Sequence, residues 1–142
     1  MKLPFLILPA VLTLLAAPAM AAMAANCSID IDSSDSMMFD KNEIVIDKTC
    51  DEFTINLTHS GKLPAKVMGH NVVISKTGDA LAIARDAMSV GLENNYLPPG
   101  DERVIAFTEI IGGGEKTAVT FKVNKLKAEE DYTFFCSFPG HI

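Results

Sequence analysis

The chain has 142 residues, which is enough for one domain with a modest core. Its formal net charge is −6. This acidic balance argues against nucleic-acid binding, which needs clustered lysine and arginine side chains to displace counterions.

The first 24 residues have the pattern of an export signal. Lys2 supplies a positive start, residues 3–17 form an apolar run, and Ala22-Met23-Ala24 matches a small-residue cleavage site. This arrangement predicts a secretory signal peptide at residues 1–24 and a mature chain that begins near Ala25. Because Asn26 precedes Cys27, a lipid-anchored cysteine is disfavoured, and we expect no membrane anchor in the mature chain.

The remaining residues, 25–142, are expected to form one domain made mostly of strands. Apolar and polar residues alternate in most of its short segments, which are separated by Gly, Pro and Asn clusters. Residues 79–91 instead have helical spacing, with Asp79 as the expected N-cap and Gly91 just past the C-terminus. Seven or eight strands with one inserted helix predict an all-β Greek-key β-sandwich or barrel. The expected strands lie around residues 29–31, 44–46, 53–57, 72–74, 104–107, 119–123 and 132–136.

The three cysteines divide into a pair and a single residue. Cys27 and Cys50 lie near the start among polar residues, whereas Cys136 lies far away in an apolar stretch. In an oxidising compartment a disulfide between Cys27 and Cys50 is the natural pairing. Cys136 would then be a free thiol, which needs a reason to stay reduced.

A histidine–cysteine set suggests such a reason. The histidines are His59, His70 and His141, and His141 follows Cys136 by five residues across a Pro-Gly turn. Two imidazoles and one thiolate suit copper, as in blue-copper electron-transfer centres. A zinc site completed by water and purely structural histidines are the alternatives, and residue spacing alone does not decide among them.

Three stretches are specific enough to indicate a family. They are LPAKVMGHNVVIS (residues 63–75), YLPPGDERVIAFTEIIGGGEKTAVTFKV (96–123) and YTFFCSFPGH (132–141). With these motifs the chain resembles the azurins, which are periplasmic bacterial cupredoxins, from Cys27 to His141. The resemblance implies a cupredoxin fold and a disulfide between Cys27 and Cys50.

The resemblance also implies a copper site. Its equatorial ligands would be His70, Cys136 and His141, with the backbone carbonyl of Gly69 as a weak further ligand. Asn71 would hydrogen-bond near the cysteine sulfur and tie the ligand loops together. His59 matches a histidine that titrates near the metal without binding it; a partly buried strand residue is the alternative interpretation.

An apolar docking patch is implied around the second histidine ligand. We use "docking patch" for these eight residues: Met37, Leu63, Val67, Met68, Met88, Phe138, Pro139 and Gly140. A small apolar face of this kind suits weak and fast contact with redox partners. The methionines could instead fill gaps in the core, which is the commoner use of methionine.

The azurin pattern continues beyond this sequence. It has an axial methionine four residues after the second histidine and then a last β-strand, whereas the sequence stops at Ile142. We therefore expect residues 25–142 to be a cupredoxin domain that lacks this strand, an incomplete fragment of the carrier. Sequence spacing offers no substitute axial ligand, so weakened copper binding and an exposed sheet edge are expected.

The resulting functional hypothesis is a periplasmic electron carrier. It would transfer single electrons through one type 1 copper ion that cycles between Cu(I) and Cu(II). Its partners would be periplasmic redox proteins such as c-type cytochromes or copper and haem reductases. The sequence has no Ser-His-Asp set, paired carboxylates or phosphate loop, so an enzyme is not expected. The alternative is an exported module that binds or buffers copper without a redox role.

Overall fold

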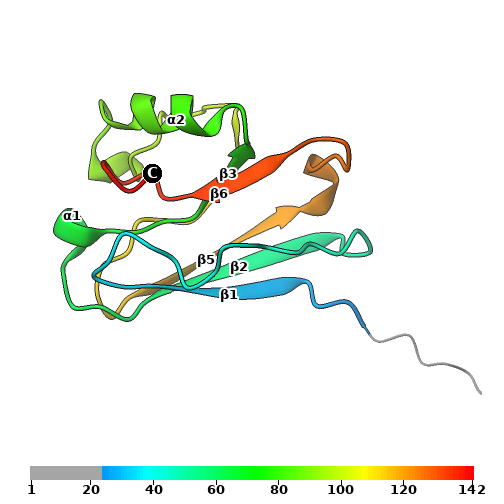
Figure 1. Ribbon diagram of the computed structural model, residues 1–142, viewed down its shortest axis with the longest axis horizontal. Coiled ribbons are helices and arrows are strands. Elements are labelled where there is room, and N and C mark those ends of the chain that lie inside the picture. Colours follow the sequence, from blue (N-terminus) through cyan, green and yellow to red (C-terminus); the bar gives the residue numbers. More distant parts are fainter. Residues whose placement is uncertain (1–23) are drawn as a thin grey trace, which may run out of the picture.

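The computed structural model describes residues 24–142 (Figure 1). The signal peptide predicted for residues 1–24 therefore lies outside the described residues, apart from Ala24. Among the described residues, no helix is both long enough and apolar enough to cross a membrane.

The strands form two three-stranded sheets. The first has the order β1-β2-β5, with β1 (Ser28–Ser33) parallel and β5 (Lys116–Lys122) antiparallel to β2 (Glu52–His59). In the second, β3 (Val73–Lys76) lies between β4 (Val104–Phe107) and β6 (Tyr132–Phe135), and both neighbours are antiparallel to it.

The core fills the space between the two sheets, as the alternation of apolar residues predicts. Every second residue of β2 is buried, because successive side chains of a strand point to opposite faces. These side chains meet those of the second sheet in one continuous cluster. Its buried members are Ile31, Phe53, Ile55, Leu57, Val72, Ile74, Ala106, Ile111 and Phe121. The predicted all-β sandwich is confirmed.

Helix α2 (Ala80–Ala87) covers the outer face of the second sheet (Figure 1). Ile83 and Ala84 pack against Val73 of β3 and Phe135 of β6. This packing fixes the two strands that lead to the predicted copper ligands.

The helix differs from the prediction at both ends. It stops at Ala87 because the amides of the next three residues bond to carbonyls three positions back, which tightens the chain into turns. Gly91 is therefore the N-cap of the 3₁₀ helix η1 (Leu92–Asn94) and is not the C-terminal glycine of α2. Asp79 precedes α2 but makes no capping hydrogen bond with its side chain.

The number of strands and helices also needs correction. The described residues contain six strands rather than seven or eight, since residues 44–46 pair with no neighbouring strand. Val45 is exposed, and Ile44 and Ile46 are half-buried against the core. Two more short helices, α1 (Ala65–Met68) and the 3₁₀ helix η2 (Val123–Lys125), were not expected.

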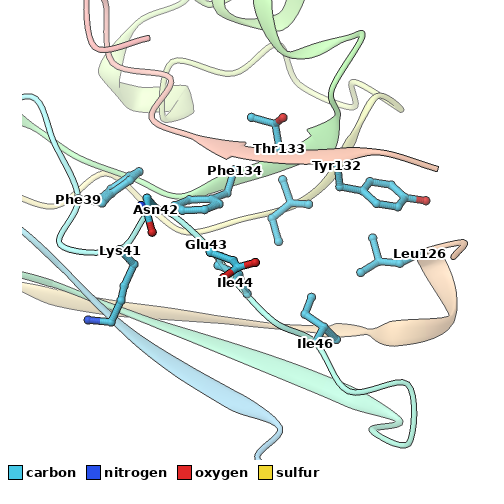
Figure 2. A pocket seen from close by; sticks show the side chains of 11 residues that line it. Phe39, Lys41, Asn42, Glu43, Ile44, Ile46, Leu126, Tyr132, Thr133 and Phe134 are labelled. Carbon is cyan, nitrogen blue, oxygen red and sulfur yellow. The ribbon is translucent and has the colours of Figure 1, made fainter. Parts of the chain in front are cut away.

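Within residues 24–142, strand β6 has a partner strand on one side only. It pairs with β3 on one side, and on the other it faces residues 41–46 across a groove of about 570 Å³ (Figure 2). Its lining is mixed: Ile44, Ile74 and Phe134 are among the apolar residues, and Lys41 and Glu43 are among the polar ones. An open edge of this kind presents unpaired backbone groups to whatever lies beside it.

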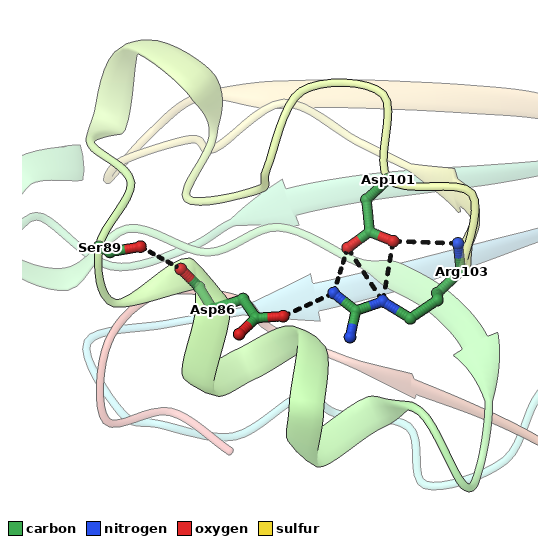
Figure 3. Close-up of polar contacts among 4 residues, drawn as sticks. All are labelled: Asp86, Ser89, Asp101 and Arg103. Atoms are coloured by element: carbon green, nitrogen blue, oxygen red, sulfur yellow. Dashed lines mark hydrogen bonds and ion pairs between the residues drawn. The ribbon is translucent and has the colours of Figure 1, made fainter.

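One disulfide and one group of ionic contacts hold the loops in place. The expected disulfide joins Cys27 to Cys50 with the Cα atoms 5.7 Å apart. In the loop before β4, the guanidinium of Arg103 donates hydrogen bonds to Asp101, and its Nη2 atom lies 2.6 Å from Asp86 Oδ2 on α2 (Figure 3). This ionic contact links α2 to the loop that precedes β4.

Candidate metal centre

The structure brings His70, Cys136 and His141 together at one end of the sandwich. His70 lies between α1 and β3, Cys136 directly follows β6, and His141 lies in the loop after it. Each offers one donor atom, and these atoms all lie within 4.8 Å of one another. The Cys136 Sγ atom is 3.6 Å from His141 Nδ1, and the two imidazole centroids are 4.7 Å apart. Residues from distant parts of the chain thus form one compact donor set.

The backbone around Gly69 places His70 at this site. Reciprocal backbone hydrogen bonds of 3.0 and 2.9 Å join His70 to Ile111. A Cβ atom on Gly69 would lie 2.3 Å from the carbonyl oxygen of Ala65, so only glycine fits there. The Gly69 carbonyl oxygen lies 3.9 Å from Cys136 Sγ. Close packing therefore brings both an imidazole and a carbonyl to the thiol.

The hydrogen bonds of His70 determine which ring nitrogen is free. Its Nε2 atom is 2.8 Å from the carbonyl oxygen of Ser34, which can only accept a hydrogen bond. Nε2 therefore carries the proton and Nδ1 keeps its lone pair. The imidazole is 1% exposed, and this burial lowers the pKa of His70, opposed in part by the bond to Ser34. A neutral imidazole with a fixed tautomer is the form that binds a metal.

The thiol of Cys136 is 5% exposed at the end of β6. Burial raises the pKa of Cys136, and hydrogen bonds from the backbone N–H groups of Asn71 and Phe138 partly oppose this effect. A cation that replaces the thiol proton would remove the cost of a buried thiolate charge. The site therefore favours a thiolate with a metal bound and a protonated thiol without one.

Asn71 joins the two ligand-bearing segments. Its buried Oδ1 atom accepts the backbone N–H of Ser137 at 2.9 Å, and its Nδ2 atom donates to Ser137 Oγ at 2.9 Å. Ser137 Oγ in turn donates to the carbonyl oxygen of Asn95 at 2.9 Å. These bonds tie the residue after His70 to the residue after Cys136.

His141 lies in a tight turn closer to the surface. Its backbone N–H bonds to the Phe138 carbonyl at 3.1 Å, and Gly140 has a φ of +86°, which favours glycine. The Phe138 ring packs 4.6 Å from the imidazole, centroid to centroid. Burial, with a smaller contribution from the charge of His70, lowers the pKa of His141 to about 4. The imidazole is therefore neutral at neutral pH.

His59 lies beside the donor set without joining it. Its ring centroid is 5.1 Å from that of His70, but both of its nitrogens have backbone partners. Nδ1 accepts the Gly61 N–H at 3.1 Å, so Nε2 donates to the Met68 carbonyl at 2.9 Å. With no free lone pair, His59 serves to pack against His70.

The docking patch is mostly exposed. Four of its apolar side chains stand out from the surface: Met37, Leu63, Val67 and Met88. Met68 and Phe138 are half-buried, and Pro139 and Gly140 are exposed next to His141. Exposed methionines at residues 37 and 88 do not fill core gaps, so for these two the core alternative is wrong.

Several contributors to the site gave no sequence signal. Ser34 acts through its carbonyl, which any residue would supply. Ser137 and Asn95 join the web around Asn71 only after folding. Asn95 has a positive φ of 56°, a conformation that asparagine adopts more readily than most residues, and this preference is the one hint that the sequence offers.

The donor types indicate the class of protein. A β-sandwich that presents two neutral imidazoles and one buried thiol at one end has the ligand set of a blue-copper protein. Residues 25–142 match the family of copper binding proteins described as the plastocyanin/azurin family. The chain belongs to this family, and its His-Cys-His cluster is compatible with one copper ion.

Close relatives support the assignment. The chain is 62% identical over 115 residues to azurin of Alcaligenes faecalis, covering 81% of this chain and 90% of that protein. It is 61% identical over 117 residues to azurin of Pseudomonas chlororaphis, with 82% and 91% covered. It is 53% identical over 130 residues to azurin of Pseudomonas aeruginosa, with 92% and 86% covered.

Proposed function

We propose that this protein is a single-electron carrier that holds one copper ion between His70, Cys136 and His141, with the Gly69 carbonyl as a weak fourth contact. The observation that carries the proposal is the convergence of the three donor atoms within 4.8 Å. Bound copper would supply a one-electron change between Cu(I) and Cu(II). The chain's own residues hold the ligands in place and keep water from the sulfur.

Rigid ligands favour this role over simple copper buffering. The His70 backbone is bonded to Ile111, its ring to Ser34, and Asn71 fastens the Cys136 loop. When the protein fixes the ligand positions, little rearrangement accompanies a change of oxidation state, which keeps the barrier to electron transfer low. A buffering protein has no need for such fixed positions.

The two imidazoles differ in burial and therefore have different roles in the proposed site. His70 is fully buried, whereas His141 is half-buried next to the exposed Pro139 and Gly140. The edge of His141 is therefore the shorter path for an electron between the site and the surface. We place the docking patch around it, where an apolar partner face would exclude water from that path.

Localisation and partners complete the proposal. The N-terminal pattern of residues 1–24 and the azurin relatives support export to the periplasm with a cleaved signal peptide. Partners would be periplasmic redox proteins, such as c-type cytochromes or copper and haem reductases. The protein would bind no nucleic acid and would not act as an enzyme.

Reversible electrochemistry tests the carrier role. Protein loaded with Cu(II) should show an intense thiolate-to-copper visible band, which disappears on reduction and returns on reoxidation over many cycles. Cys136→Ser, which retains a donor of similar size but no thiolate, should lose the band. Copper that binds with this band but cannot be cycled would leave only the buffering function.

A further inference from the structure

The turn after η1 places the aromatic ring of Tyr96 against the segment that carries His141. The ring centroids of Tyr96 and Phe138 are 5.2 Å apart with an interplanar angle of 71°, which is an edge-to-face contact. Phe138 in turn packs 4.6 Å from the imidazole of His141, centroid to centroid. We propose that Tyr96 is a positioning residue that fixes the orientation of His141 through Phe138. The proposal rests on the proposed function, because this orientation matters for electron transfer only if His141 binds copper.

The imidazole of His141 has fewer anchors than that of His70. The ring of His70 is bonded to the Ser34 carbonyl, whereas within residues 24–142 the ring of His141 makes no hydrogen bond to the backbone. The backbone N–H of His141 bonds inside its own turn, to the Phe138 carbonyl. A Cβ atom on Gly140 would have no neighbour within 4 Å, so this turn has open space beside it. The orientation of His141 therefore depends on what holds Phe138.

The backbone of Tyr96 points to a special role for its ring. Tyr96 has a φ of 51° and directly follows Asn95, which has a φ of 56°. In the part of the chain that the structure describes, these two are the only residues other than glycine with a positive φ. Asparagine adopts this conformation readily, but tyrosine does so rarely, because its Cβ atom crowds the carbonyl oxygen. A strained conformation of this kind persists where surrounding contacts offset its cost, and such positions gather at functional sites.

The two adjacent residues of this turn hold two adjacent residues of the ligand loop. The carbonyl oxygen of Asn95 accepts the hydroxyl of Ser137 at 2.9 Å and the amide of Asn71 at 3.3 Å. The next residue, Tyr96, contacts the residue after Ser137, which is Phe138. The polar contacts therefore set the position of the loop, and the aromatic contact sets the orientation of the Phe138 ring.

Substitutions of Tyr96 separate the ring from the backbone. Tyr96→Phe keeps the ring and removes only the hydroxyl, so it should behave as the parent does. Tyr96→Leu loses the ring and keeps the strained backbone, whereas Tyr96→Asn loses the ring but suits the positive φ. If the ring is the cause, both should change the surroundings of His141 equally. Tyr132→Leu is the matched control, because it removes the other tyrosine ring of the chain, whose hydroxyl bonds to the Lys127 N–H away from the donor set.

NMR of the metal-free proteins gives the first measurement. In the parent, in Tyr96→Phe and in Tyr132→Leu, nuclear Overhauser effects between the Phe138 and His141 rings should be equally strong. In Tyr96→Leu and Tyr96→Asn they should weaken, and the Phe138 ring should flip about two- to tenfold faster, the factor that corresponds to one lost aromatic pair.

Copper binding gives the second measurement. Tyr96→Leu and Tyr96→Asn should bind Cu(II) about two- to tenfold more weakly, because the binding orientation of His141 is less populated beforehand. The EPR splitting and the thiolate-to-copper band should shift in the same two variants. Combining Tyr96→Leu with Phe138→Leu tests the route: since Tyr96 acts through Phe138, the double variant should match Phe138→Leu alone.

The outcomes separate this proposal from the electron-carrier function. Overhauser effects and spectra that stay at parent values in Tyr96→Leu and Tyr96→Asn would overturn it. So would a change in Tyr96→Leu alone, which would assign the effect to the backbone, or fully additive effects in the double variant. Absence of a thiolate-to-copper band in the parent would overturn the carrier function, and NMR of the metal-free proteins would still decide whether Tyr96 orients His141. Urea unfolding verifies that each variant folds, and Tyr96→Asn carries the test if Tyr96→Leu does not.

Discussion

The bonds around Asn71 give a sharp prediction for stability. Replacing Asn71 with alanine removes the acceptor of the buried Ser137 N–H, which has no other partner within the described residues. A buried donor left unpaired costs about 1–3 kcal/mol, and the lost amide contacts add about 1 kcal/mol. We therefore expect Asn71→Ala to lower the free energy of unfolding by about 2–4 kcal/mol.

Ser137→Ala is the matched control for this prediction. It removes the hydroxyl but leaves the Ser137 N–H bonded to Asn71 Oδ1, and Asn71 Nδ2 keeps the Asn95 carbonyl at 3.3 Å. No buried group is orphaned, so the expected cost is about 1 kcal/mol. Because the two side chains share a bond, the double variant should cost about 1 kcal/mol less than the sum of the single changes.

Urea unfolding of the metal-free proteins measures all three variants. The midpoint should fall while the slope stays constant, since the surface exposed on unfolding hardly changes. If Ser137→Ala destabilises as much as Asn71→Ala, the orphaned N–H is not the cause. An Asn71→Ala protein within about 0.5 kcal/mol of the parent would refute the whole bond-by-bond argument.

Three further changes test other parts of the fold. The hydrogen bond from Arg103 lowers the pKa of Asp101 in the folded protein. The Asp101 carboxylate therefore stabilises the fold above its unfolded pKa of about 4, and this contribution is lost as pH falls through the lower folded pKa. Asp101→Asn should be less stable than the parent at pH 7 in thermal melts, and the difference should shrink below about pH 4. Replacing Cys27 and Cys50 with serine opens a loop spanning 23 positions and should cost about 3 kcal/mol in urea unfolding. Val67→Lys places a charge on the exposed docking patch. It should slow electron self-exchange, measured by NMR line broadening in mixtures of the Cu(I) and Cu(II) forms, while the visible spectrum stays the same. An unchanged rate would exclude Val67 from the contact face.

The sequence predicted those parts of the fold that depend on local pattern. Alternating residues such as Phe53, Ile55 and Leu57 gave β2, because one buried face imposes a period of two. Residues 44–46 have a similar composition but formed no strand, since a strand also needs a partner for its backbone groups, and pairing is not encoded within the segment itself. The end of α2 was missed for a related reason: turns of three-residue spacing can replace the last helical turn without any change of composition.

In the metal centre, too, some features could be predicted from the sequence and others could not. His70, Cys136 and His141 were identified from the donor types and the family resemblance, and the fold brings them within 4.8 Å of one another. Among the contacts that orient them, the resemblance indicated only Asn71. A contact through a backbone group, such as the Ser34 carbonyl, could not be predicted, because any side chain would allow it.

The loop of residues 34–38 shows why these backbone contacts matter for function. The Ser34 carbonyl of this loop accepts the Nε2 proton of His70 and so fixes the tautomer of that imidazole. If electron transfer depends on a rigid ligand set, loosening the loop should impair it even when every copper ligand is intact. Asp35→Asn weakens the bonds to Lys62 and Leu63 without touching a ligand, so electrochemistry of the copper form should show slower electron transfer, whereas an unchanged rate would mean that the loop is held sufficiently by its β-bridge.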